Sequence, residues 1–135
     1  MGRMEDTELY IRACRFSDQV FVVVARWPDF ARITFGSQLV RSLDSVGANL
    51  VEGDGRGWGA DALRFFRIAR ASCREMRHWI HRAHARNLMD DQLASSWINE
   101  ATELVGMING LIRFRQENPK LVKESSAIYD DPFIH

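Results

Sequence analysis

Arginine and histidine side chains recur every three or four positions in the middle of this 135-residue chain. They are Arg64, Arg67, Arg70, Arg74, Arg77, His81 and His84. Residues at that spacing lie along one side of an α-helix, so the pattern predicts a basic band on a single helix. Guanidinium groups bind phosphate in bidentate fashion, and several cations along a surface give salt-dependent affinity for nucleic acid. The segment therefore predicts an anion-binding face.

The charge of the chain is segregated, although its formal net value is zero. Residues 56–86 carry +6, while residues 1–55 carry −2 and residues 87–135 carry −4. A neutral total does not exclude an anionic partner, because local fields steer docking. The alternative is a solvated helix face whose arginines pair with acids on neighbouring helices, such as Asp44 or Glu103. The sequence leaves these two interpretations about equally open.

A second polar set interrupts two apolar segments and predicts buried hydrogen bonds. Its members are Arg41, Ser42, Ser45, Asn49, Glu52, Gly53, Arg56, Ser72 and Glu75. Buried carboxylates need donors, which Arg41 or Arg56 would supply, so we expect this set to fix the register of a helical hairpin. An acid/base pair of Glu52 and Glu75 is the catalytic alternative, but no nucleophile or substrate pocket accompanies it.

The sequence predicts no catalytic residue, metal or cofactor. Glu75 and His78 match the Glu-x-x-His element of di-iron bundles, but every other histidine except His135 lies on the same segment, so the second half of such a site is missing. The glycine-rich stretch at 53–59 lacks the Lys-Ser/Thr of a P-loop. We interpret it as a mobile connection in which Trp58 is an exposed contact residue.

Four segments with helical period position these side chains. We expect helices at about 7–27, 34–52, 60–86 and 90–116, and a tail at 117–135. Short connections favour an antiparallel up-down-up-down four-helix bundle in one domain, residues 1–116. Gly47 suggests a close approach of helices, and Gly53 suggests a left-handed helix terminator. The last helix has an unusually wide apolar face, which favours an oligomer.

The sequence also contains signals that bear on where in the cell the protein is located. Cys14 and Cys73 fall on apolar or small-residue helix faces, which predicts buried, reduced thiols. The apolar run at 20–24 is too short to span a bilayer, and no signal peptide is recognisable. We therefore expect a cytoplasmic protein that does not use a membrane as its partner.

Three strings of residues carry a family resemblance. They are Gln38-Leu-Val-Arg-Ser42 with Ser45, Asn49-Leu-Val-Glu-Gly-x-Gly-Arg56, and Phe65-Phe-x-Ile-Ala-x-x-Ser-x-x-Glu75. Together with the Trp27-Pro28 turn they resemble the bacterial four-helix-bundle family named for proteins encoded in intervening sequences of 23S ribosomal RNA genes. That family also includes the accessory variability determinant of diversity-generating retroelements. The resemblance covers roughly residues 7–114.

The resemblance implies an antiparallel four-helix bundle that assembles into a homo-oligomeric ring, commonly a pentamer, with no known enzymatic activity. The retroelement members bind a reverse transcriptase and nucleic acid through basic surfaces. We therefore expect a non-catalytic accessory protein that binds nucleic acid, or a ribonucleoprotein partner such as a reverse transcriptase, through the basic band. The alternative is a protein–protein adaptor or scaffold oligomer whose band docks acidic surfaces and does not bind nucleic acid.

Overall fold

The computed structural model describes residues 2–118, and every regular element in that range is helical. The long helices are α1 (Glu8–Val24), α3 (Ser37–Gly55), α4 (Ala60–Ala85) and α5 (Asp91–Glu117). The short elements are the 3-10 turn η1 (Met4–Asp6), the helix α2 (Asp29–Ala31) and the π-helical turn η2 (Arg32–Gly36). The all-α class predicted from the sequence is confirmed.

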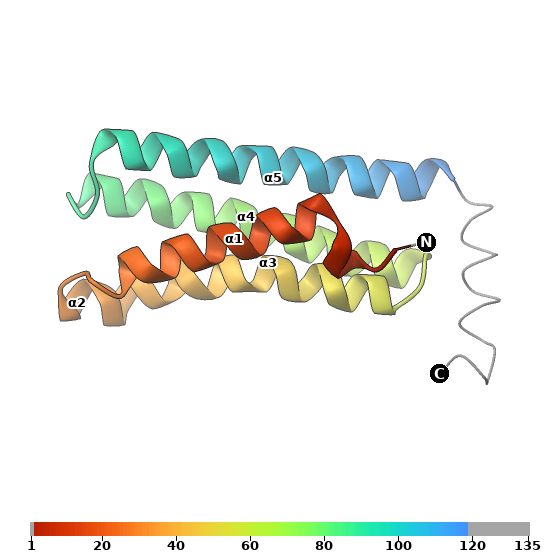
Figure 1. Cartoon of the computed structure of the whole chain (residues 1–135), viewed down its shortest axis with the longest axis horizontal. Coiled ribbons are helices and arrows are strands. Elements are labelled where there is room, and N and C mark those ends of the chain that lie inside the picture. The colour runs from red at the N-terminus through yellow and green to blue at the C-terminus, as the bar shows by residue number, and fades with distance from the viewer. Residues whose placement is uncertain (1, 119–135) are drawn as a thin grey trace.

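The long helices lie side by side along one axis and enclose a single core (Figure 1). α3 packs extensively on α4, α4 packs on α5, and α1 covers the remaining side by contacting both α3 and α5. The N-terminus and the connection from α3 to α4 lie at one end of the molecule, which we call the loop end (Figure 1). α2 and the connection from α4 to α5 lie at the other, the α2 end.

Local sequence signals explain where the helices begin and end. The Thr7 side chain accepts a hydrogen bond from the Tyr10 N–H at 3.2 Å, and Asp90 accepts one from the Leu93 N–H at 2.7 Å, so both cap free donors at helix starts. α4 stops where Asn87 adopts a φ of 60°, and the Leu88 N–H then bonds to the Ala83 carbonyl at 3.0 Å. That geometry is the usual left-handed helix termination.

The second helical stretch is longer than the predicted 34–52, because α2, η2 and α3 follow one another without a break from Asp29. Pro28 sits just before its first turn, where the missing N–H is harmless. The predicted left-handed conformation of Gly53 is wrong, since α3 continues through it to Gly55. Within residues 2–118, Gly57 is the glycine with positive φ, at 90°.

The core follows the predicted helical stripes. Its fully buried large side chains include Phe16, Leu39, Leu43, Leu50, Phe66, Met76, Ile80, Leu104 and Ile108. Much of the wide apolar face of α5 packs within the bundle, and the expectation of an oligomer stays a prediction. Ile98, Val105 and Leu111 are half-buried and pack on the core, because α5 touches both α4 and α1.

Two further expectations concern the cysteines and the membrane. Cys73 is buried and Cys14 half-buried, and both are free thiols. Among residues 2–118, no helix has the length and apolar character that a bilayer crossing requires.

Candidate nucleic-acid interface

The basic band divides into two parallel rows on α4. The core side of the helix is taken by small and apolar residues such as Ala69, Cys73 and Met76, so the arginines and histidines fall on the remaining surface. The outer row consists of Arg67, Arg74 and His81, all exposed. The inner row consists of Arg70, Arg77 and His84, all half-buried. Neighbours in a row are seven residues apart, which is about 10 Å along a helix.

The inner row is held by uncharged and acidic groups of α5. Arg70 donates from Nη1 to the Asn109 side-chain oxygen at 2.9 Å, and Arg77 donates to the Thr102 hydroxyl at 3.4 Å. The His84 ring bonds to the Asp91 carboxylate near the α2 end. Asn109 and Thr102 fix the position of two guanidinium groups without neutralising them, and a guanidinium has further N–H donors to offer.

The carboxylates that were candidates to neutralise the band are engaged elsewhere. Glu103 binds Arg12 of α1, and Asp44 accepts a hydrogen bond from Ser17. Arg64 pairs with Asp61 at 3.1 Å, but both groups are exposed and such pairs are weak. Within residues 2–118, Arg67, Arg70, Arg74 and Arg77 form no ion pair. Within the part of the chain that is described, these four positive charges are not neutralised and can bind an external anion.

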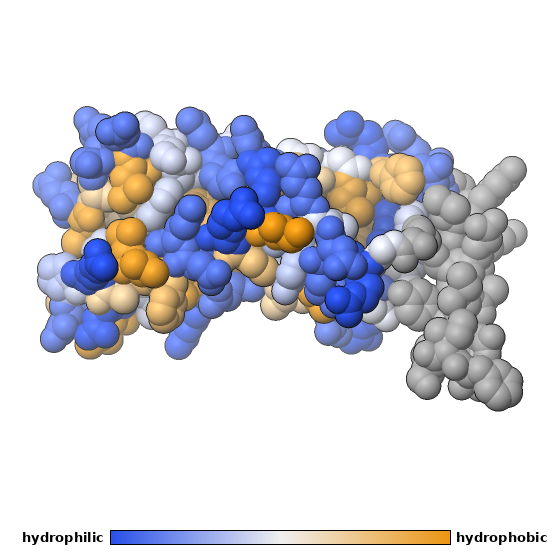
Figure 2. Space-filling model, in the orientation of Figure 1, coloured by the Kyte–Doolittle hydropathy of each residue, from blue (hydrophilic) through white to orange (hydrophobic). Residues whose placement is uncertain are grey.

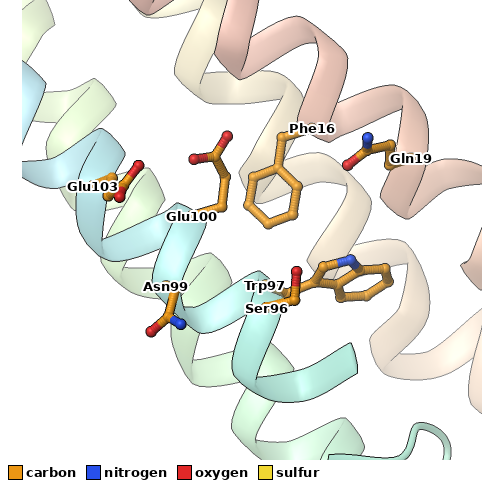
Figure 3. Close-up of a pocket in the computed structure, with 7 residues that line it drawn as sticks. All are labelled: Phe16, Gln19, Ser96, Trp97, Asn99, Glu100 and Glu103. Carbon is orange, nitrogen blue, oxygen red and sulfur yellow. The ribbon is translucent and has the colours of Figure 1, made fainter. Parts of the chain in front are cut away.

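Arg12 of α1 binds two acids of α5, Glu100 and Glu103, on the side of α5 that faces α1. Its guanidinium bonds to both Glu100 and Glu103, and these hydrogen bonds raise the pKa of Arg12 above its ordinary value, so the arginine stays charged. Figure 3 shows Glu100 beside Phe16 and Glu103 farther along α5, both lining a shallow cavity of about 260 Å³ between α1 and α5. These two acids of α5 therefore lie toward α1 and do not neutralise the arginine rows of α4.

Three members of the polar set join α3 to α4. The Ser45 and Ser72 hydroxyls lie 2.9 Å apart and join the two helices, while Asn49 donates to the Ser45 hydroxyl at 2.8 Å. Ser42 bonds back to the Leu39 carbonyl of its own helix at 2.8 Å. A hydroxyl pair at one point of a helix hairpin satisfies buried groups in a single register, which is the role predicted for this set.

The expected burial of Glu52 and Glu75 is wrong, because both side chains are exposed. Glu52 instead bonds to Arg56 one helical turn later, at 2.8 Å. Arg41 is also exposed and lies at a groove between α1 and α3. Glu75 and His78 face solvent on α4, and no group of three or more metal-ligating side chains occurs in the part of the chain described.

The glycine-rich connection packs around Arg115, a residue that the sequence pattern did not single out. Arg115 of α5 is 5% exposed, lies 3.9 Å from the Trp58 ring centre, and donates to the Gly57 carbonyl at 2.8 Å. Its Nη2 donates to the Asp54 carboxylate at 3.3 Å. Trp58 is consequently buried, at 6% exposure, so the prediction of an exposed contact residue is wrong. The burial of Arg115 could have been predicted from its position, because residue 115 continues the buried stripe of residues 104, 108 and 112.

Gly53 is required by packing and not by backbone conformation. A Cβ added there would lie 2.7 Å from a ring carbon of Phe66 and 3.0 Å from the Ala62 carbonyl oxygen. The α3 backbone therefore approaches α4 at the point where the motif Glu52-Gly53 occurs. At Gly47, by contrast, the nearest atom to an added Cβ is a Tyr10 ring carbon at 3.4 Å, which is ordinary contact.

Comparison with known proteins agrees with this fold. A sequence model of the 23S rRNA-intervening sequence protein family matches residues 5–110. No curated protein matches the chain. A similar solved structure is the crystal structure of a protein of unknown function from the S23 ribosomal protein family of Bacteroides thetaiotaomicron VPI-5482. The TM-score is 0.69 at 19% identity, over 77% of this chain and 97% of that one.

Proposed function

The chain belongs to the 23S rRNA-intervening sequence protein family, and we propose that it is a non-catalytic accessory protein that binds nucleic acid through the basic band of α4. The same surface would serve a ribonucleoprotein partner such as a reverse transcriptase. In this proposal phosphate oxygens are bound by the two rows of cations, and the rest of the bundle is a scaffold that works in the cytoplasm.

One observation carries the proposal. Arg67, Arg70, Arg74 and Arg77 project along about 15 Å of a single rigid helix and form no ion pair within residues 2–118. Nucleic-acid backbones present regularly spaced negative charges, and their neutralisation releases condensed counterions. Because Asn109 and Thr102 restrain the inner row, part of the side-chain ordering that binding requires is already present in the free chain.

The test is charge reversal at three positions of the band, Arg67→Glu, Arg70→Glu and Arg74→Glu together. We expect affinity for mixed-sequence RNA and DNA to fall by at least about 100-fold at low salt, and the slope of log K against log[salt] to flatten by about 2 to 3. The matched control reverses Arg3, Arg15 and Arg26, which are exposed just before η1, on α1 and just after α1, and which change the net charge equally. Equal losses of affinity in both variants would show that net charge alone, and not the band, accounts for the effect.

Unchanged binding in the band variant would refute the proposal. Absence of binding by the native chain at every salt concentration would leave the rival, a protein–protein adaptor whose band docks acidic surfaces. That rival has support of its own in the exposed aromatic and aliphatic side chains of the bundle, such as Phe30 and Phe114, which are 82% and 50% exposed.

We also propose that the subunits are antiparallel up-down-up-down bundles that assemble into a homo-oligomeric ring, with a pentamer favoured. The family resemblance suggests the ring, and the placement of the interhelical connections at alternating ends in Figure 1 supports the helix order. A pentamer has five times the chain mass of 15.6 kDa, which sedimentation equilibrium or light scattering measures directly. A mass of one chain at micromolar concentration would rule the ring out.

A further inference from the structure

Large apolar side chains are exposed at the α2 end of the bundle. Phe21 and Val22 of α1 are more than half exposed, and Ile33 of η2 is 68% exposed. Figure 2 shows hydrophobic surface at this end of the molecule, over α1 and the region of α2. Exposed apolar side chains gathered in one place on a soluble bundle indicate a contact surface.

These side chains border a groove of about 490 Å³ between α1, η2 and α3. Its walls are formed chiefly by Phe21, Val24, Ile33, Val40, Arg32 and Arg41. The charged residues that line it are both arginines. Arg32 pairs with the exposed Asp29 at 3.0 Å, whereas Arg41 has no ion pair within residues 2–118. The groove is therefore apolar with a positive edge, and it fits a segment that carries acids next to large apolar side chains.

The chain itself contains such a segment beyond the described residues. The sequence at 129–135 is Tyr-Asp-Asp-Pro-Phe-Ile-His, in which two carboxylates precede two large apolar side chains. Arg41 of α3 lies nearer the loop end than Ile33 of η2, and Asn118 follows α5 at the loop end (Figure 1). A segment that runs from Asn118 toward the α2 end would pass Arg41 before it reaches Ile33, so acids and apolar groups follow in the matching order.

The length of the chain permits this contact. The 27 residues of α5 correspond to about 40 Å of helix, which approximates the distance from Asn118 back to the α2 end. The 15 residues from 119 to 133 span up to about 50 Å when extended. This 40 Å is the length along the bundle axis, and the groove lies to the side of α5 beyond α1, so Phe133 reaches Ile33 of its own chain when the tail is nearly extended.

We propose that residues 129–135 of the same chain occupy the groove between α1, η2 and α3. Phe133 and Ile134 cover Phe21 and Ile33, and Asp130 and Asp131 pair with Arg41 and Arg32. The docked segment removes exposed apolar surface from water and leaves the basic band on α4 free. This inference does not depend on nucleic-acid binding.

Disulfide trapping in the full-length chain tests the proposal. In a Cys14→Ser background, Ile33→Cys is combined with Phe133→Cys, and the rate of disulfide formation is followed under mild oxidation by non-reducing gels and peptide mass spectrometry. The control pair combines Ile11→Cys with Phe133→Cys. Ile11 is also an exposed apolar residue of α1, and it lies nearer the loop end, so an undocked tail would meet it more often.

Docking predicts that the Ile33 pair forms within one chain at least about 10-fold faster than the Ile11 pair, because binding raises the effective concentration of the two thiols. Arg41→Glu should remove most of that advantage, and adding Asp130→Arg with Asp131→Arg should restore part of it. Equal rates for the two pairs would overturn the proposal. So would disulfides that join only different chains, or dimers of the single variant Ile33→Cys, which place a second copy in the groove.

Discussion

Arg115 brings a positive charge into the loop end of the core, where its guanidinium carbon lies 3.9 Å from the centre of the Trp58 ring and 4.9 Å from that of Phe66. A planar guanidinium can lie over aromatic rings and still donate hydrogen bonds in its plane, which an ammonium group cannot do. Here it donates to the Gly57 carbonyl and to Asp54, and Asp54 also accepts from the Met4 N–H at 3.2 Å. One side chain thus ties together α5, the glycine-rich connection and η1.

Replacing Arg115 should therefore lower the free energy of unfolding by more than its position near a helix end suggests. For Arg115→Met we expect a loss of about 2–4 kcal/mol in the free energy of unfolding, because the Gly57 carbonyl and the Asp54 carboxylate lose a buried donor. Urea denaturation followed by tryptophan fluorescence measures the loss. Arg113→Met, two residues earlier and exposed, serves as the control and should stay within about 0.5 kcal/mol of the native protein. Equal values for the two variants would contradict this account.

At the scale of elements, α3 shows that two glycines in one helix can have opposite effects. Gly53 is closed in by the buried Phe66 ring and the backbone of α4, and neither can move away without disturbing the core. Gly47 faces Tyr10 and Cys14 of α1 at ordinary contact distances. Alanine is preferred to glycine inside a helix by about 1 kcal/mol, so the space beside each glycine decides the sign of a substitution.

We expect Gly53→Ala to lower the free energy of unfolding by about 1–3 kcal/mol, since overpacking a rigid contact outweighs the gain in helix propensity. Gly47→Ala should raise it, by up to about 1 kcal/mol. Chemical denaturation of the two variants side by side makes the comparison. A stabilising Gly53→Ala would mean that α3 and α4 can separate at this point, and that the glycine is not there for close packing.

Helical period was sufficient to locate the elements and much of the core, because burial on a helix repeats with the turn. Leu39, Leu43, Val46 and Leu50 of α3 are all buried as the spacing predicts. Period was also sufficient to separate the basic band of α4 from its apolar stripe. It did not distinguish the two rows of the band, because that division depends on which side of α4 the helix α5 covers.

The incorrect predictions depend on contacts between elements. Trp58 was expected in solvent because it lies among glycines, but the Arg115 guanidinium arrives from another helix and covers it. Glu52 was expected in the interior because of its apolar neighbours, yet α3 turns that side chain outward to Arg56. The resemblance to the 23S rRNA-intervening sequence proteins, which depends on a string of residues and not on period, is confirmed by the family match over residues 5–110.

At the scale of the whole molecule, charge is distributed around the bundle axis. The two rows of the band lie on the side of α4 that faces away from α1, while Arg12 keeps Glu100 and Glu103 of α5 against α1. This arrangement keeps Glu100 and Glu103 away from Arg67, Arg70, Arg74 and Arg77, in a chain whose net charge is zero. An anionic partner can therefore approach one face without repulsion from the acids of the other.

The whole molecule also determines how Cys73 reacts. Its thiol lies in the centre of the core, and burial raises its pKa to about 12 from an ordinary value of 9.0. As pH rises above about 9 the unfolded chain loses this proton while the folded chain keeps it, so ionisation favours unfolding between pH 9 and about 12.

At pH 8 the buried thiol should be alkylated only when the bundle opens. For a domain of ordinary stability that makes iodoacetamide labelling of Cys73 slower by about a thousandfold or more than in the urea-unfolded chain. Mass spectrometry of the labelled peptides measures Cys73 and Cys14 in one experiment. Cys14 is half-buried and should react through smaller motions, well before Cys73. Equal labelling rates for the two thiols would contradict the expected order, and a rate for Cys73 close to that of the unfolded chain would show that its part of the core opens readily.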